Sequence, residues 1–162
     1  MPRHLPIALA CLAPLLAQAE RFEAVVSRVS DGDTVWVRPV NGDPPRQVRI
    51  AGIDAPEICQ AFGDDSREAL AARVLRKRVV VDTSGQDDWR RVLARIELAH
   101  QDVGGWMVAQ GYAWSYRFRG DPGPYAREEA GARRARAGLW RPGDAQAPRD
   151  FRVQHGPCAA HR

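Results

Sequence analysis

The chain has 162 residues, of which 44% are hydrophobic and 27% charged, as in an ordinary globular protein. This length is enough for one domain and excludes two domains of comfortable size. The net charge of +4 is carried almost entirely by arginine, because Lys77 is the only lysine. Arginine is the better bidentate phosphate ligand, so the bias suits nucleic acid, but a high-GC genome produces the same bias. Composition alone therefore decides nothing about the substrate.

The N-terminus has the three-part pattern of a secretory signal peptide. Residues 1–4 are short and positive, residues 5–17 are apolar, and Ala17-Gln18-Ala19 is a small-x-small cleavage site. We expect residues 1–19 to be removed, so that the mature chain starts near Glu20 and is periplasmic or secreted. The apolar run is too short to span a membrane. An uncleaved anchor and lipidation at Cys11 remain as alternatives.

Export leaves an even pair of cysteines, Cys59 and Cys158, in the mature chain. In an oxidising compartment such a pair is expected to form a disulfide, which would tie the C-terminal tail beside residue 57. The alternative is a metal site made of His155, Cys158 and His161. A structural zinc ion requires four ligands, so the disulfide is favoured.

Two short strands and the residues just after them carry the candidate chemistry. Following a first strand at 22–29, residues 34–38 and 47–50 alternate as strands, and the turn residues 41–45 predict a hairpin between them. That hairpin places Asp33 and Arg49 on neighbouring strands, with Asp54 and Glu57 just beyond. Carboxylate oxygens beside an arginine suit a divalent cation and a phosphate.

The remaining elements are predicted from caps, turns and alternation. A capping box at 65–68 predicts a helix start, residues 79–81 a buried strand, 85–88 a turn and 92–98 a further strand. Asp102 can cap a short helix that ends at Gly111. A last helix is expected from about 121–124 to Gly138, and the segment after Arg141 has little regular pattern. These elements predict an α+β fold, mainly β: a five-stranded OB-type β-barrel with about three α-helices packed outside.

Five motifs in this order resemble the staphylococcal nuclease-like (thermonuclease) family from about residue 25 to residue 140. They are Asp31-Gly32-Asp33-Thr34, Val48-Arg49-Ile50 with Gly52-Ile53-Asp54-Ala55-Pro56-Glu57, the stretch 87–94, Gln110-Gly111-Tyr112-Ala113-Trp114, and Glu129-Ala130 with Gly138-Leu139-Trp140. We therefore expect a nuclease-like domain at 20–141 and a C-terminal tail at 142–162.

The resemblance implies calcium-dependent hydrolysis of phosphodiester bonds in DNA and RNA. Position by position, Asp33 and Asp54 match the metal-binding carboxylates. Ala55 stands where the family's prototype has threonine and offers a backbone carbonyl to the metal. Glu57 matches the carboxylate that orients or deprotonates the attacking water. Arg49 and Arg91 match the two arginines that hold the phosphate.

The sequence departs from the family beside the second arginine. The family usually has Tyr-Gly-Arg where this chain has Trp89-Arg90-Arg91, so either Arg90 or Arg91 is the phosphate ligand, and the spacing favours Arg91. Trp89 can still stack on a base. Asp88 replaces a basic residue, which weakens contact with a terminal phosphate. Tyr116 is a further candidate for the nucleotide pocket, although aromatic residues at such spacing more often fill a core.

Two functions follow from these residues. The first is an exported nuclease that requires Ca²⁺, acts on DNA or RNA as a monomer and needs no stable protein partner. The second is a non-catalytic OB-type module that binds nucleic acid and uses the same arginines only for their charge. A binding module has no reason to keep two aspartates, a glutamate and an arginine together, so the nuclease is favoured.

Overall fold

The structure is a computed structural model that describes residues 19–117, 120–141, 143, 145–156 and 158. The predicted signal peptide therefore lies almost entirely outside the described residues, as do Cys11 and His161. In the part of the chain that is described, no helix is both long and apolar enough to cross a bilayer.

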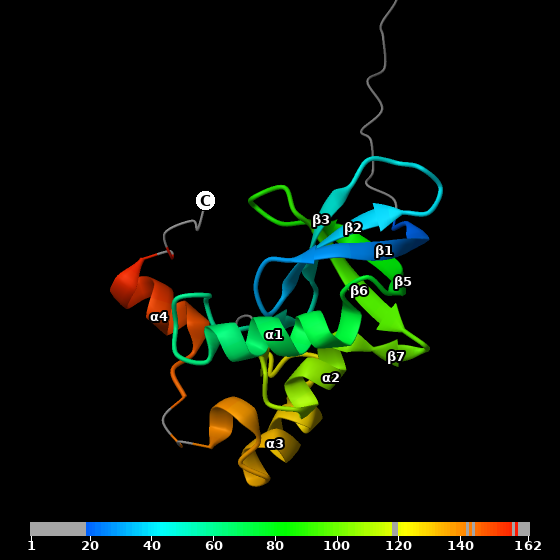
Figure 1. Cartoon of the computed structure of the whole chain (residues 1–162). Helices are drawn as coiled ribbons and strands as arrows, with labels where there is room; N and C mark the ends of the chain where they lie inside the picture. The colour runs from blue at the N-terminus through cyan, green and yellow to red at the C-terminus, as the bar shows by residue number, and fades with distance from the viewer. Residues whose placement is uncertain (1–18, 118–119, 142, 144, 157, 159–162) are drawn as a thin grey trace, which may run out of the picture.

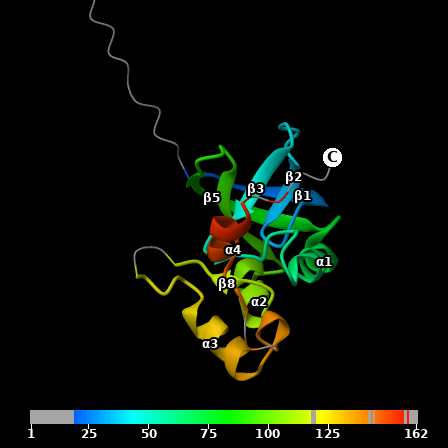
Figure 2. The ribbon, with the colours of Figure 1, turned by 90° about the vertical axis from the view of Figure 1, so that its left-hand side faces the viewer.

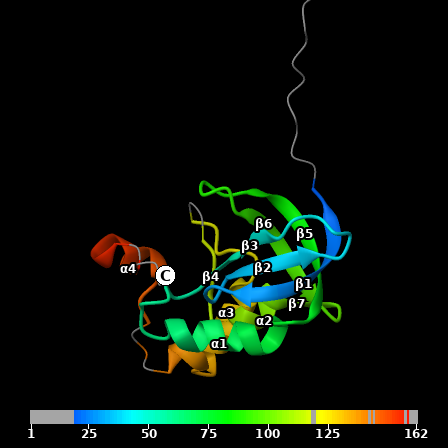
Figure 3. The same ribbon diagram turned by 45° about the horizontal axis from the view of Figure 1, so that its top comes forward.

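Five strands close into a barrel in the order β3-β2-β1-β5-β6, and a parallel pairing of β3 with β6 completes the circle. All other pairs in the barrel are antiparallel. The strands are β1 (Arg21–Val29), β2 (Thr34–Pro39), β3 (Arg46–Ile50), β5 (Arg78–Gln86) and β6 (Val92–Leu98). Figure 3 shows them curving around a common centre. The predicted OB-type barrel is confirmed.

Alternation along the strands fills the barrel with aliphatic side chains, because successive residues of a strand face opposite sides. Val35 and Val37 of β2 and Val48 and Ile50 of β3 are fully or almost fully buried. Strand β5 runs through Gly85 to Gln86, where a turn was predicted. That part of the prediction is wrong, since the register shift at Thr83/Gly85 carries the strand past the glycine.

Three short strands accompany the barrel: one is added to its sheet beside β6, and two form a separate two-stranded sheet. β4 (Ile53–Asp54) pairs antiparallel with β8 (Trp114–Ser115), and β7 (Gln101–Asp102) pairs with β6. The β4–β8 pair brings the chain around Tyr116 next to the end of β3, because the Tyr116 N–H donates to the carbonyl of Gly52 at 2.9 Å. Residues from two distant parts of the sequence therefore meet at this end of the barrel.

Helices α1 (Gly63–Val74), α2 (Val103–Ala109) and α3 (Ala126–Arg134) gather on one side of the barrel (Figure 1). Asp102 caps α2 as predicted, accepting a hydrogen bond from the Gly105 N–H at 3.0 Å. The predicted start of α1 is wrong: the helix begins before the capping box, after Phe62 in the left-handed region (φ 71°). Ser66 is buried instead and donates to the carbonyl of Tyr112.

A buried carboxylate anchors α3. Glu129 is 1% exposed. It accepts from the Ser115 N–H at 2.9 Å, from Arg117 at 2.6 Å and from Arg133 at 2.8 Å. Charge-assisted hydrogen bonds of this kind satisfy a buried carboxylate and fix the segment that they join. Glu129 therefore holds the chain before Tyr116 against α3.

The end of α3 also differs from the prediction. The helix stops at Arg134, Arg136 adopts a left-handed φ of 51°, and a 3₁₀ turn η1 (Gly138–Trp140) follows. Gly138 is needed for a close approach rather than as a helix stop, since a Cβ there would lie 2.3 Å from the carbonyl oxygen of Gly111.

The tail after Arg141 is more regular than predicted, because it contains helix α4 (Pro148–His155). Pro148 occupies the first turn, where its missing N–H has no cost. Helix α4 lies on the outside of the molecule, at the left in Figure 1 and on the side that faces the viewer in Figure 2. A disulfide between Cys59 and Cys158 ties the segment after α4 to the loop before α1.

Candidate active site

A cavity of about 810 Å³ opens at the end of the barrel where β3, β4 and the β5–β6 turn meet. Every catalytic, metal and substrate residue predicted from the sequence lines it: Asp33, Arg49, Asp54, Ala55, Glu57, Trp89, Arg91 and Tyr116. The sequence reasoning did not assign a role to two other lining residues, Asp31 and Arg152. Residues that are far apart in the chain thus line the same cavity: Asp54 and Arg152, for example, are 98 positions apart.

The hairpin register brings Arg49 between two carboxylates. Thr34 on β2 faces Arg49 on β3, so Asp33 lies beside that arginine at the strand's start. The guanidinium pairs with Asp33 (Nη1–Oδ2 2.9 Å) and with Asp54 on β4 (Nη2–Oδ1 3.2 Å). It also donates to the carbonyl of Ile53 at 3.0 Å. Since all three charged side chains are largely buried, the geometry of this group is tightly defined.

Asp33 is held by neighbours on both of its oxygens. Its Oδ2 accepts from the Ala55 N–H at 2.8 Å, and its Oδ1 accepts from the Thr34 hydroxyl at 3.0 Å. The contact from Ala55 joins the β4 loop to the start of β2. Ala55 is itself buried, at 4% exposure, so its backbone is fixed beside the two carboxylates.

Negative charge is in excess at this point. Burial and repulsion from Asp33 raise the pKa of Asp54 to about 6, although Arg49 and Arg152 act in the opposite direction. Burial and the proximity of Asp33 likewise raise the pKa of Asp31 to about 7. Among the described residues, no three acidic, histidine or cysteine side chains form a metal-binding group by themselves. Two carboxylates and a backbone carbonyl, however, are hard oxygen donors that fit a calcium ion, and the excess negative charge would favour one.

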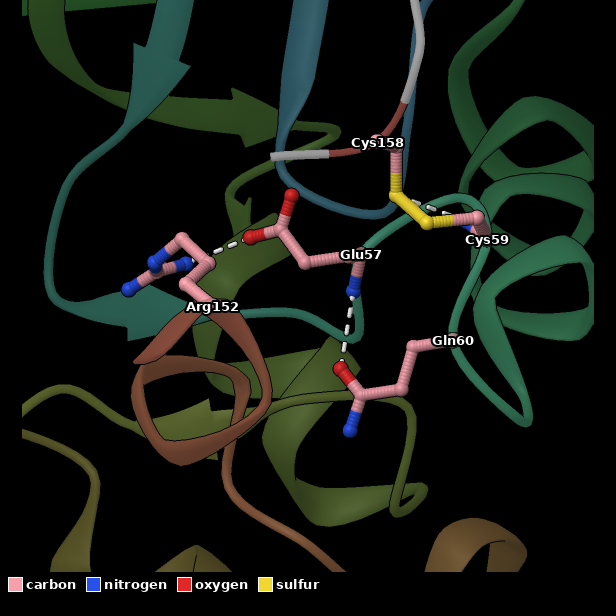
Figure 4. The surroundings of a disulfide bond; sticks show 5 residues. All are labelled: Glu57, Cys59, Gln60, Arg152 and Cys158. Carbon is pink, nitrogen blue, oxygen red and sulfur yellow. Dashed lines mark hydrogen bonds and ion pairs between the residues drawn. A yellow bond between two sulfur atoms is a disulfide. The ribbon is translucent and has the colours of Figure 1, made fainter. Parts of the chain in front are cut away.

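Glu57 lies on the loop between β4 and α1. Its backbone N–H donates to the side-chain carbonyl of Gln60 at 3.1 Å, and its carboxylate Oε1 accepts from Arg152 of α4 at 2.5 Å. Figure 4 shows Arg152 pointing from α4 toward this carboxylate. Arg152 also pairs with Asp54 (Nη2–Oδ2 3.5 Å). The only sequence signal for Arg152 was the cysteine pair that ties its segment to this loop.

Arg91 reaches the cavity from the turn between β5 and β6. Its Nε pairs with Asp87 at 2.6 Å, and its Nη1 lies 3.4 Å from the Thr34 hydroxyl. Although burial acts to raise it, hydrogen bonds from Arg91 hold the pKa of Asp87 below its usual range. Arg90 does not line the cavity and adopts a left-handed φ of 63°. The structure thus places Arg91, rather than Arg90, at the site.

Two exposed aromatic side chains stand at the cavity. Trp89 is 76% exposed, its ring centroid 5.4 Å from the guanidinium carbon of Arg91, and Tyr116 is 46% exposed. Exposed rings at the mouth of such a cavity can stack on bases. Two aromatic residues that shortly precede Tyr116 do not line the cavity: Trp114 packs edge-on against Trp140, and Tyr112 stacks on Phe62. Asp88 lines the cavity as an additional negative charge.

The structure does not have the alternative metal site of His155, Cys158 and His161, because Cys158 forms a disulfide. The sulfur of Cys158 is bonded to that of Cys59, so it is not available as a ligand beside His155. The His161 of that alternative lies outside the described residues.

Comparison with known proteins gives the same family as the five motifs. The family described as Staphylococcal nuclease homologue matches residues 47–142. "Protein ParB" of Escherichia coli is 45% identical over 127 residues, covering 71% of this chain and 70% of that protein. "Micrococcal nuclease" of Shigella flexneri is 39% identical over 142 residues, covering 81% and 80%. An "Uncharacterized endonuclease" of Haemophilus influenzae is 35% identical over 135 residues, covering 83% and 75%. With its barrel, its cavity and these relatives, the chain belongs to the staphylococcal nuclease homologue family.

Proposed function

We propose that this protein is an exported, calcium-dependent nuclease that hydrolyses phosphodiester bonds in DNA, RNA or both. The observation that carries the proposal is the group formed by Asp33, Arg49 and Asp54 in a cavity that also holds Glu57 and Arg91. The relatives named as nuclease and endonuclease support the same class of enzyme. A module that only binds nucleic acid does not require buried carboxylates beside its arginines.

In this mechanism the arginines hold the phosphate. Arg49 lies on β3, and Arg91 lies just before β6, the strand that pairs in parallel with β3. Both present planar guanidinium groups to the cavity, which match phosphoryl oxygens and the negative charge that develops on them. Trp89 and Tyr116 offer exposed rings for the adjoining bases. The substrate is thereby fixed with its phosphorus facing Glu57.

Glu57 takes the proton of the attacking water. As the water oxygen bonds to phosphorus, one proton moves to the Glu57 carboxylate, and the bond from phosphorus to the leaving oxygen breaks. The leaving oxygen receives its proton from solvent. Calcium held by Asp33, Asp54 and the Ala55 carbonyl would supply a Lewis acid and a template for the phosphate oxygens.

Removal of calcium tests this proposal directly. Cleavage of single-stranded DNA by the purified chain is measured with calcium, with a calcium chelator, and with the chelator followed by excess calcium. We expect the chelator to lower the rate by at least about 100-fold and added calcium to restore it, because the carboxylates require a cation to bind a phosphate. Intact binding of DNA without cleavage under any of these conditions would instead favour the non-catalytic module.

Export is supported by the N-terminal pattern of residues 1–19 and by the disulfide between Cys59 and Cys158, a bond that persists in oxidising compartments. We expect mass spectrometry of the protein recovered from the periplasm or the medium to show a chain that starts at Glu20. Export would be contradicted if the chain were recovered only from the cytoplasm and still began at Met1. That result would not affect the nuclease activity, which the cleavage assay tests separately.

A further inference from the structure

A helix outside the family match reaches back to the active site. The match to the family covers residues 47–142, whereas α4 spans Pro148–His155. Yet Arg152 of this helix lines the same cavity as Glu57 and Asp54. The segment beyond the family domain therefore contributes a charged side chain to the site, and this contribution is not explained by the mechanism above.

Three connections hold the tail on the loop that carries Glu57. The disulfide joins Cys59, two residues after Glu57, to Cys158, three residues after α4. The Gln60 side chain is 8% exposed and bridges the two segments, accepting from the Glu57 N–H at 3.1 Å and donating to the carbonyl of Gln146 at 2.7 Å. Within the first connection, the Cys59 N–H also donates to the Cys158 sulfur at 3.1 Å. Figure 4 shows Glu57, Cys59, Gln60 and Cys158 together.

The third connection is the pair of Arg152 with Glu57. One guanidinium nitrogen donates to Glu57 Oε1 at 2.5 Å, and the other lies 3.5 Å from Asp54 Oδ2. Glu57 lies on an irregular loop, and its side chain has three rotatable bonds that a free carboxylate would sample. A charge-assisted hydrogen bond to one carboxylate oxygen, from a guanidinium that also faces Asp54, restricts that motion.

We propose that Arg152 is a positioning residue for Glu57, and that the disulfide holds it in place by tethering α4 to the Glu57 loop. The proposal rests on the proposed nuclease function and deepens it. It adds Arg152, a residue from outside the family match, to the residues that orient the Glu57 carboxylate toward the attacking water. In this arrangement the orientation of Glu57 depends on a covalent bond formed between positions 59 and 158.

Two observations favour a positioning role over a lid that blocks the site. The cavity has a volume of about 810 Å³ with Arg152 among its lining residues, so the side chain does not fill it. A lid must also leave, whereas α4 is attached on its C-terminal side by the disulfide and on its N-terminal side through Gln146. The fixed attachment suits a side chain that acts in every catalytic cycle.

The first test compares Arg152→Ala with Arg152→Lys, and uses Arg149→Ala as the matched control. Arg149 lies on the same helix and is exposed, and it does not line the cavity. In steady-state cleavage of single-stranded DNA with saturating calcium, we expect Arg152→Ala to lower kcat about tenfold and to change KM less than about twofold, because a misdirected base affects the chemical step. Arg152→Lys should recover part of kcat, and Arg149→Ala should match the original chain.

The second test removes the tether. A Cys59→Ser/Cys158→Ser chain should lose about as much kcat as Arg152→Ala, and adding Arg152→Ala to it should cost little more, because both changes remove the same contact. Circular dichroism and thermal unfolding confirm that each variant is folded. If the serine chain does not fold, the comparison of alanine, lysine and control variants still decides the role of Arg152.

Several results would overturn the proposal. Unchanged kcat in Arg152→Ala, a rise in KM alone, or faster cleavage at limiting calcium would each assign Arg152 to another role, the last of them to inhibition. Full activity of the serine chain would overturn the tethering step. An original chain that cleaves nothing overturns the proposed function and this inference together, whereas an active original chain with an equally active Arg152→Ala variant overturns the inference alone.

Discussion

Replacing Glu57 with glutamine lowers the rate of DNA cleavage by about 10²–10⁴-fold, which is the contribution expected of a positioned general base. Glutamine keeps the shape of the side chain and an oxygen that can still accept from Arg152, so the contact with α4 is retained. Because Glu57 and Arg152 are partly exposed, we expect the change in unfolding free energy to stay within about 1 kcal/mol. The measurement is single-turnover cleavage of a labelled single-stranded DNA with saturating calcium.

Glu68→Gln is the matched control for Glu57→Gln. Glu68 is an exposed carboxylate on α1 that does not line the cavity, and among the described residues it pairs only with Arg67, at 3.5 Å. Its replacement should leave the rate unchanged. A Glu57→Gln chain that cleaves at more than about a tenth of the original rate would remove Glu57 from the role of base.

Replacing Arg49 with alanine is expected to affect both activity and stability. Loss of a preorganised donor to the developing charge lowers kcat/KM by about 10²–10³-fold. The same change leaves Asp33 and Asp54 buried without their shared partner, and breaking a buried pair costs about 3–5 kcal/mol. We expect the lower end of that range, because Asp33 keeps its hydrogen bond from the Ala55 N–H. Urea unfolding and cleavage assays measure the two effects separately.

Arg46→Ala provides a matched comparison on the same strand. Arg46 also bridges two carboxylates, Glu20 at 2.6 Å and Asp43 at 2.9 Å, but this group is more exposed and lies outside the cavity. We expect a stability loss of about 1 kcal/mol and no loss of activity. If Arg49→Ala and Arg46→Ala were equally active, the phosphate would have to be held by other residues.

The barrel and most of the site could be predicted because their signals are local. Alternation of apolar and polar residues marks the strands, and the turn at 41–45 fixes the hairpin whose register sets Asp33 beside Arg49. The motif order then identified the residues that line the cavity. What the residues do in catalysis remains a prediction, which the variants above are designed to test.

The helix boundaries that were predicted incorrectly are set by tertiary contacts. The capping box at 65–68 does not begin α1, because Gly63 already starts the helix where it presses on the preceding loop: a Cβ there would lie 2.1 Å from the carbonyl oxygen of Glu57. Similarly, Gly138 serves the approach to Gly111 rather than ending α3. These close approaches, one of them between residues 27 positions apart, leave no capping or periodic pattern that predicts a helix boundary.

Helix α4 and the placement of Arg152 escaped prediction for a different reason. Apart from the buried Pro148, α4 is mostly exposed, so the apolar spacing that predicts helices is weak in this segment. Its position is set by a disulfide and a few polar contacts instead. Pro148 in the first turn was the one helix-start signal in this segment. Asp31, whose pKa is raised by its burial and by the neighbouring Asp33, was named only as part of the first family motif and had no role of its own.

The disulfide has a consequence for the covalent topology of the molecule. It spans 99 positions and closes residues 59–158 into a ring, with the chain before it forming an arm. The arm carries Asp33, Arg49 and Glu57, whereas the ring carries Arg91 and Arg152. A protease that cuts once within the ring therefore produces two pieces that remain one molecule until the disulfide is reduced, and the candidate site residues of the arm and of the ring stay together in it.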